Sequence, residues 1–156
     1  MKIKTIIFDF DGVIADSLPM HFKKMVDFAQ NVFGVKEEEK TIIDHIRSKS
    51  YFEVMKTFKI SWTKIPLIMS LIHKAREELF FEIDKVKIFP GIKSSVKELN
   101  KKNIRLIILS SNLKKTIDKF LLLNKISEFD QVHSESNLFG KDVSIKRIMQ
   151  ENNLKK

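Results

Sequence analysis

A short apolar segment, residues 3–8, places hydrophobic side chains on both alternating sets of positions. This pattern predicts a strand covered on both faces, as in the interior of a parallel sheet. Asp9, Asp11 and Gly12 follow directly. Ionised carboxylates beside a core are costly unless they are paired or bound to a metal, and open α/β sheets bind ligands at the carboxyl ends of their strands. We therefore expect Asp9 and Asp11 to belong to a functional site.

From about residue 16 to residue 85 the apolar residues recur at intervals of three and four, with no strand pattern between them. Helices are predicted at 18–34, 36–46 and 51–58, with Arg47 to Ser50 as a polar break. A longer helix, capped by Ser61 or Thr63, is predicted to run to about Glu82. This region is expected to be an all-helical insertion.

The remaining chain alternates between helical and strand patterns. Pro90 and Gly91 indicate a turn before a helix at 92–102. A buried strand at 105–109 ends in Ser110, Ser111 and Asn112, and a helix at 113–124, a weaker strand at 129–133 and a helix at 143–153 follow. Such alternation predicts right-handed crossovers and a parallel sheet. The expected fold is therefore α/β, with a core of residues 1–15 and 87–156 and an insertion of residues 16–86.

Composition narrows the class of protein further. The 156 residues suffice for one domain or for a core with a small insertion. The absence of cysteine excludes disulfides and thiolate metal sites and favours a reducing cytoplasm. Charges interrupt every apolar stretch before it reaches a membrane-spanning length, so no membrane partner is expected.

The formal net charge is +9, and only four of the 29 basic residues are arginine. Nucleic-acid binders usually cluster their basic residues and use arginine for bidentate contacts. The spread of lysines along this chain instead indicates solvated faces, with attraction of anionic substrates as the alternative. We expect a small phosphorylated substrate and no nucleic-acid partner.

The candidate residues suit phosphoryl transfer. An aspartate can attack phosphorus and so divide one difficult step into two. Mg²⁺ prefers carboxylates, carbonyls and water as ligands, and would accompany the phosphate. The hydroxyl of Ser110, just before a helix start, is suited to hold phosphate oxygens. Lys141 can neutralise both the phosphate and the nucleophile.

These motifs resemble the haloacid dehalogenase-like hydrolase superfamily, in the branch with a helical cap inserted after the first motif. FDFDGVIADS is similar to the first motif, LIILSSN to the second and FGKD to the third. The resemblance implies a Rossmann-like core and Mg²⁺ as cofactor. It also implies Asp9 as nucleophile and metal ligand, and Asp11 as general acid/base and second metal ligand. Phosphate and substrate contacts are implied for Ser110, Lys141, Gly12, Ser111 and Asn112.

The second aspartate favours phosphate esters, because dehalogenases of this family lack an acid there. DSLPMH resembles phosphoglycolate phosphatases, other sugar-phosphate phosphatases and β-phosphoglucomutase-like enzymes, which places His21 where it can steer Asp11. IRSKS resembles the cap loop over the substrate, with Arg47 and Lys49 as contacts. A phosphatase is the leading hypothesis; a phosphomutase and a non-catalytic binding or regulatory paralogue are the alternatives.

The family's fourth motif, an acidic pair after a fourth strand, has no counterpart before ENNLKK. We therefore expect a core that is incomplete at its C-terminal side, with the strand at 3–8 at the sheet edge. Three explanations stay open: a piece of a longer protein, completion by a partner chain, or a degenerate paralogue. Substrate identity and oligomeric state have no signature in the sequence.

Overall fold

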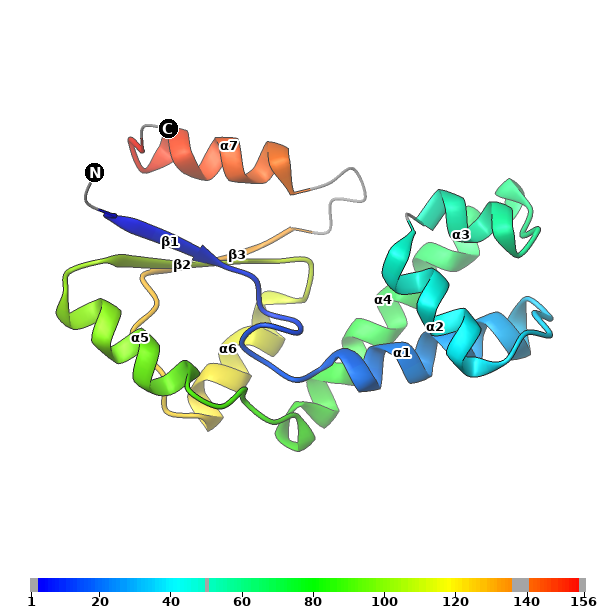
Figure 1. Ribbon diagram of the computed structural model, residues 1–156, viewed down its shortest axis with the longest axis horizontal. Coiled ribbons are helices and arrows are strands. Elements are labelled where there is room, and N and C mark those ends of the chain that lie inside the picture. The colour runs from blue at the N-terminus through cyan, green and yellow to red at the C-terminus, as the bar shows by residue number, and fades with distance from the viewer. Residues whose placement is uncertain (1–2, 50, 136–140, 155–156) are drawn as a thin grey trace. The chain divides into compact units, whose positions relative to one another are not determined.

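A computed structural model describes residues 3–49, 51–135 and 141–154 of the chain. The protein divides into two compact units. The first is a sheet unit made of Met1–Ser17 and Leu79–Lys156, and the second is a helical unit, Leu18–Glu78. Figure 1 shows both units, each of which is described by itself below.

The sheet unit is built on three parallel strands, β1 (Thr5–Phe8), β2 (Arg105–Ser110) and β3 (Gln131–Ser134), in the order β1-β2-β3. Ile7 is in register with Ile107, and Ile108 with Val132. The expected α/β fold with a parallel sheet is confirmed. Because all three strands run the same way, their carboxyl ends lie at one edge of the sheet.

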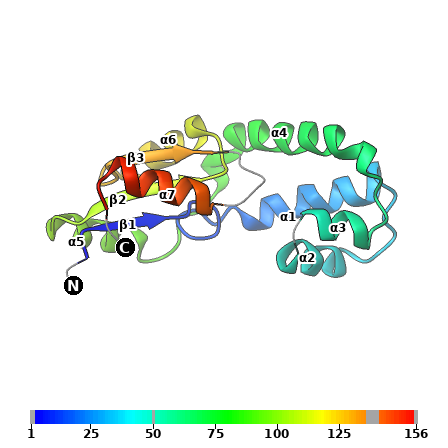
Figure 2. The same cartoon turned by 90° about the horizontal axis from the view of Figure 1, so that it is seen from above.

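Helices cover both faces of this sheet. Helices α5 (Ile92–Lys101) and α6 (Lys114–Leu123) lie on one side, and α7 (Asp142–Glu151) lies over the other in both views (Figures 1 and 2). Ile148 of α7 packs with Ile107 and Leu109 of β2. Strand β2 is the centre of the core, because residues 106–109 are at most 3% exposed.

Strand β1 departs from its expected burial. All four of its residues are half-buried, whereas the apolar pattern predicted full cover on both faces. Among the described strands β1 pairs only with β2, so it lies at the edge of the sheet, as the family pattern led us to expect. A strand with a neighbour on one side keeps part of its surface accessible, which explains the intermediate burial.

The helical unit contains α1 (Leu18–Asp27), a π-helical turn at Phe28–Val32, α2 (Glu39–Ser48), α3 (Tyr51–Thr57), a 3₁₀ turn at Trp62–Lys64 and the larger part of α4 (Ile65–Glu82). Its core holds Val26, Ala29, Val35 and Ile42, which are at most 8% exposed. In the described part of the chain, no helix is both long and apolar enough to span a membrane.

The division between the units differs from the expected boundaries at 15/16 and 86/87. Leu79 and Ile83 are almost fully buried, and the 3₁₀ turn at Ile83–Lys85 contacts α6. The last turn of α4 therefore belongs with the sheet unit.

The predicted polar break at Arg47 to Ser50 is also wrong in part, because α2 continues through Ser48. The Ser48 hydroxyl donates to the carbonyl oxygen of Asp44 at 2.6 Å, one helical turn back. This bond satisfies the hydroxyl without ending the helix. Arg47 therefore lies on a helix and not in a loop.

Candidate active site

The loop after β1 turns tightly and carries both candidate aspartates. The carbonyl oxygen of Phe10 accepts backbone N–H groups of Ile14 at 2.9 Å and Ala15 at 3.0 Å. Gly12 has φ of +76°, a left-handed conformation that favours glycine. Phe10, Ile14 and Ala15 are fully buried. This buried turn fixes Asp9 and Asp11 at the carboxyl end of the first strand.

Three buried side chains contact the carboxylate of Asp11. The Ser17 hydroxyl donates to Oδ1 at 2.6 Å, and the Ser110 hydroxyl donates to Oδ2 at 3.4 Å. The amide nitrogen of Asn112 lies 3.2 Å from Oδ1 and 3.4 Å from Oδ2. Ser17, Ser110 and Asn112 are at most 2% exposed. These contacts join the loops that follow β1 and β2.

Asn112 is itself held in one orientation. Its Oδ1 accepts the backbone N–H of Leu113 at 2.8 Å, and its backbone carbonyl accepts the Ser134 hydroxyl at 2.6 Å. Its own backbone N–H donates to the Ser110 hydroxyl oxygen at 3.0 Å. The oxygen end of the side chain is therefore used by the helix start, and the nitrogen end is directed at Asp11.

Asp9 forms an ion pair with Lys141. The Lys141 Nζ lies 2.5 Å from Oδ2 of Asp9, and the two side chains are 44% and 41% exposed. The other carboxylate oxygen accepts the backbone N–H of Phe10 at 2.8 Å. Lys141 is the residue that precedes α7. The start of that helix thus brings a cation to an aspartate that is still accessible to a ligand.

The structure brings together Asp9, Asp11, Ser110, Asn112 and Lys141, from three separate segments of the chain. Gly12 lies on the first of these segments, and Ser111 is exposed on the second. The expected catalytic set is therefore assembled at the carboxyl edge of the sheet. The roles of its members stay predictions.

The other three candidates belong to the helical unit. His21 is half-buried on α1. The Arg47 guanidinium lies 4.6 Å from the centre of the Phe22 ring, a cation–π contact. The Lys49 ammonium donates to the Thr57 hydroxyl at 3.0 Å. Each has a position within its own unit, and their use as substrate contacts stays a prediction.

Sequence reasoning missed Ser17 and Ser134. Ser17 stands at the end of FDFDGVIADS, and its return to Asp11 depends on the tight turn that Gly12 permits. A glycine followed five residues later by a hydroxyl was the available signal. Ser134 ends a different strand, and only the parallel register of β2 and β3 places it beside Asn112.

The donor set fits a magnesium ion held by few protein ligands. Mg²⁺ is usually bound by one or two carboxylates and completes its shell with water and substrate phosphate. The accessible carboxylate of Asp9 meets that requirement, whereas that of Asp11 is already engaged by three side chains. Residues 3–49, 51–135 and 141–154 contain no cluster of three or more acidic, histidine or cysteine ligands.

Comparison with known families identifies the protein class. Residues 6–156 match the model of the haloacid dehalogenase-like hydrolases. The chain belongs to this family. The three motifs thus occur in a member of the family that they resemble, and the sheet unit has its Rossmann-like fold.

Similar proteins include phosphatases. The chain is 28% identical over 120 residues to a phosphoglycolate phosphatase of Synechococcus elongatus. This match covers 76% of the chain and 54% of that enzyme, so the chain spans about half the length of its curated relative.

Solved structures of the same fold extend over almost the whole chain. A haloacid dehalogenase-like hydrolase of Streptococcus pneumoniae has a TM-score of 0.73 at 20% identity, with 97% of this chain and 71% of that one covered. CbbY of Rhodobacter sphaeroides, solved with phosphate, has a TM-score of 0.66 at 17% identity, with 98% and 74% covered. At these identities the likeness shows the fold.

Proposed function

We propose that the protein is a phosphatase of a small phosphorylated metabolite, such as a sugar phosphate or a phosphoglycolate-like acid. The observation that carries this proposal is the convergence of Asp9, Asp11, Ser110 and Lys141 at one edge of the sheet. The match to a phosphoglycolate phosphatase supports the substrate class. The absence of cysteine supports a cytoplasmic location as part of the same proposal.

The proposed reaction has two steps. In the first, a carboxylate oxygen of Asp9 attacks phosphorus, the ester P–O bond breaks, and protonated Asp11 gives its proton to the leaving alkoxide. In the second, Asp11 takes a proton from water, whose oxygen attacks phosphorus and releases phosphate and Asp9. Lys141 offsets the negative charge of the phosphate, and the Ser110 hydroxyl binds one of its oxygens.

The contacts of Asp11 suit this double role. Ser17, Ser110 and Asn112 hold its carboxylate in place, and all three are buried. A group that must first give and then take a proton gains from a fixed position relative to the reacting atoms. Asp11 is therefore proposed as general acid and base.

Magnesium is the proposed cofactor. The Asp9 carboxylate would hold it, with Asp11 contributing through its backbone carbonyl. When bound, the ion would supply charge stabilisation to the phosphoryl oxygens. The helical unit is proposed as a cap that selects substrate, with His21, Arg47 and Lys49 as candidate contacts.

Phosphate release from a panel of sugar phosphates and 2-phosphoglycolate, with Mg²⁺ present, tests the proposal. Asp9→Asn should lower kcat by about 10³-fold or more, because it removes the nucleophile. Asp16→Asn is the matched control, since Asp16 is an exposed acid at the end of the same loop. Retained activity in Asp9→Asn would refute the nucleophile, and an isomer product without phosphate release would show a phosphomutase instead. Wild-type protein that releases no phosphate from any substrate would favour the non-catalytic paralogue.

A further inference from the structure

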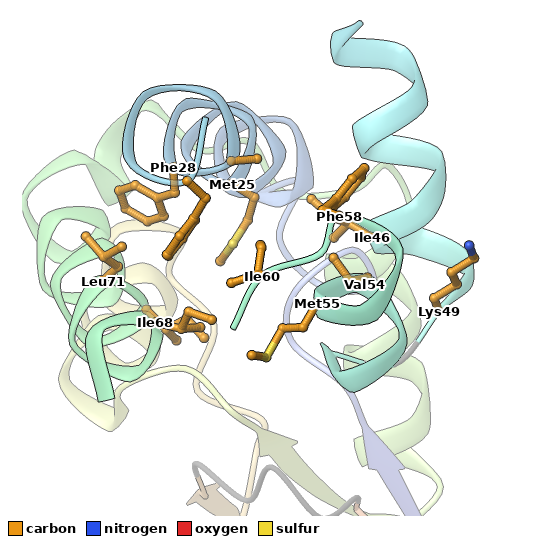
Figure 3. A pocket seen from close by; sticks show the side chains of 13 residues that line it. Met25, Phe28, Ile46, Lys49, Val54, Met55, Phe58, Ile60, Ile68 and Leu71 are labelled. Atoms are coloured by element: carbon orange, nitrogen blue, oxygen red, sulfur yellow. The ribbon is translucent and has the colours of Figure 1, made fainter. Parts of the chain in front are cut away.

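The helical unit encloses an apolar cavity of about 290 Å³ (Figure 3). Residues of α1, the π-helical turn, α2, α3 and α4 line it, and every lining side chain except that of Lys49 is apolar. This cavity lies within the helical unit and is separate from the residues assembled at the carboxyl edge of the sheet.

The backbone beside the cavity is irregular. The N–H of Phe33 donates to the carbonyl oxygen of Phe28 at 3.1 Å, the i to i+5 bond of a π-helical turn, and both rings line the cavity. Such turns are rare and occur frequently at functional sites. Met25 and Met55 also line the cavity and point into it in Figure 3. Methionine side chains adapt their shape to a bound molecule.

The size and lining of the cavity define the chemistry of an occupant. A dry apolar cavity of about 150 Å³ is enough to bind benzene. A cavity of about 290 Å³ therefore has room for a chain of roughly eight carbon atoms. Its apolar walls offer water few hydrogen-bond partners, so an apolar chain is the favoured occupant.

Lys49 adds a charge at the edge of this cavity. Its carbon stem contributes to the lining, and Figure 3 shows its nitrogen directed outward from the apolar side chains. The Thr57 hydroxyl accepts one hydrogen bond from this nitrogen at 3.0 Å. An ammonium carries three donors, so the same group can also bind an anionic head.

We propose that the cavity binds a medium-chain carboxylate of about eight carbons. The alkyl chain fills the space between Met25, Phe28, Met55 and Ile68, and the carboxylate pairs with Lys49. This site gives the helical unit a ligand of its own, different from the phosphorylated substrate proposed for the sheet unit.

Titration of the full chain with octanoate, followed by NMR of ¹³C-labelled methionine methyl groups, tests the site. The methyl signals of Met25 and Met55 should shift saturably, while those of Met69 and Met149, outside the cavity, should not. Equal shifts at all four positions, or no shift at Met25 and Met55, would overturn the proposal.

Two pairs of measurements then separate the chain from the head group. Lys49→Gln should weaken octanoate binding about two- to fivefold, the range of an exposed ion pair, and leave octan-1-ol binding unchanged. Ile68→Trp should fill the cavity and weaken both ligands more than tenfold, whereas Leu67→Trp, at a 39% exposed position on the same helix, should not. Wild-type affinity in a folded Ile68→Trp variant would place the ligand elsewhere. Equal loss of octanoate and octan-1-ol in Lys49→Gln would refute the role of the charge. The Lys49→Gln comparison stays decisive if Ile68→Trp does not fold.

Discussion

The side-chain amide nitrogen of Asn112 lies 3.2 Å from Oδ1 of Asp11, although the two residues are 101 positions apart in the chain. The motif that carries Asn112 predicted a substrate contact, but its donor is directed at the second aspartate of the first motif. Because Leu113 and Ser134 fix the other polar atoms of Asn112, this direction is set by the fold. We therefore interpret Asn112 as a positioning residue for Asp11.

Replacing Asn112 tests this interpretation. Asn112→Ala should lower kcat about ten- to hundredfold, the equivalent of a lost hydrogen bond to a charged group, with little change in KM. Asn112→Ser keeps a donor and should recover part of the loss. Lys114→Met is the control, because Lys114 is exposed on α6 and pairs with Asp118 at 2.7 Å. A rise in KM with unchanged kcat would show that Asn112 contacts substrate instead.

The ion pair between Lys141 and Asp9 gives a second prediction. Lys141→Met should lower kcat/KM for phosphate release about hundredfold, because the phosphate then meets Asp9 without a neutralising cation. Lys141→Arg keeps the charge in a different shape and should fall between the two. Lys146→Met, at an exposed lysine of the same helix, serves as control. Equal kcat/KM values for Lys141→Met and the control would rule out the proposed role.

Glu78 and Lys24 join α4 to α1 within the helical unit, at 2.5 Å between Oε2 and Nζ. The hydrogen bond from Lys24 is the main reason that the pKa of Glu78 lies below its ordinary value of 4.5. A lowered pKa means that the folded state favours the ionised form. Its contribution to stability is complete above the ordinary pKa and is lost as the pH falls through the lowered one.

Lys24→Met should therefore lower the free energy of unfolding at pH 7 by about 0.5 kcal/mol, a small value because the Glu78 side chain is 45% exposed. The difference from wild type should disappear once the pH falls below the lowered pKa of Glu78. Urea unfolding at several pH values measures it, with exposed Lys23→Met as control. A difference that persists after Glu78 is protonated would contradict the assignment to this ion pair.

The sequence predicted well the elements whose pattern is local. The apolar run at 105–109 became the most buried strand, β2. The end of α4 at Glu82 also followed from its apolar spacing, and the Ser61 hydroxyl accepts the N–H of Thr63 as the expected cap. In these segments burial and propensity favour the same structure.

Features set by contacts between distant segments were not predictable in the same way. Strand β1 has the composition of an interior strand, but its burial depends on its neighbours in the sheet. The direction of the Asn112 amide depends on Ser134, which a different strand carries. Ser48 ended the predicted helix early because its polar side chain is equally compatible with a loop and with a bond to Asp44.

The packing of Phe10 on Phe120 links the site to the core and provides the last prediction. Both side chains are fully buried, and their rings meet edge to face with centres 5.2 Å apart. Phe120→Ala should lower the free energy of unfolding by about 3–5 kcal/mol, since it removes a buried ring and leaves a cavity. Phe120→Leu keeps most of the apolar volume and should cost less, which keeps the measurement accessible if the alanine variant does not fold. Leu122→Ala, at a position 78% exposed on the same helix, should change it by less than about 0.5 kcal/mol. Because Phe10 lies between Asp9 and Asp11, folded Phe120→Leu should also lower kcat. A stability loss without any change in kcat would show that the turn keeps the aspartates in place without this ring.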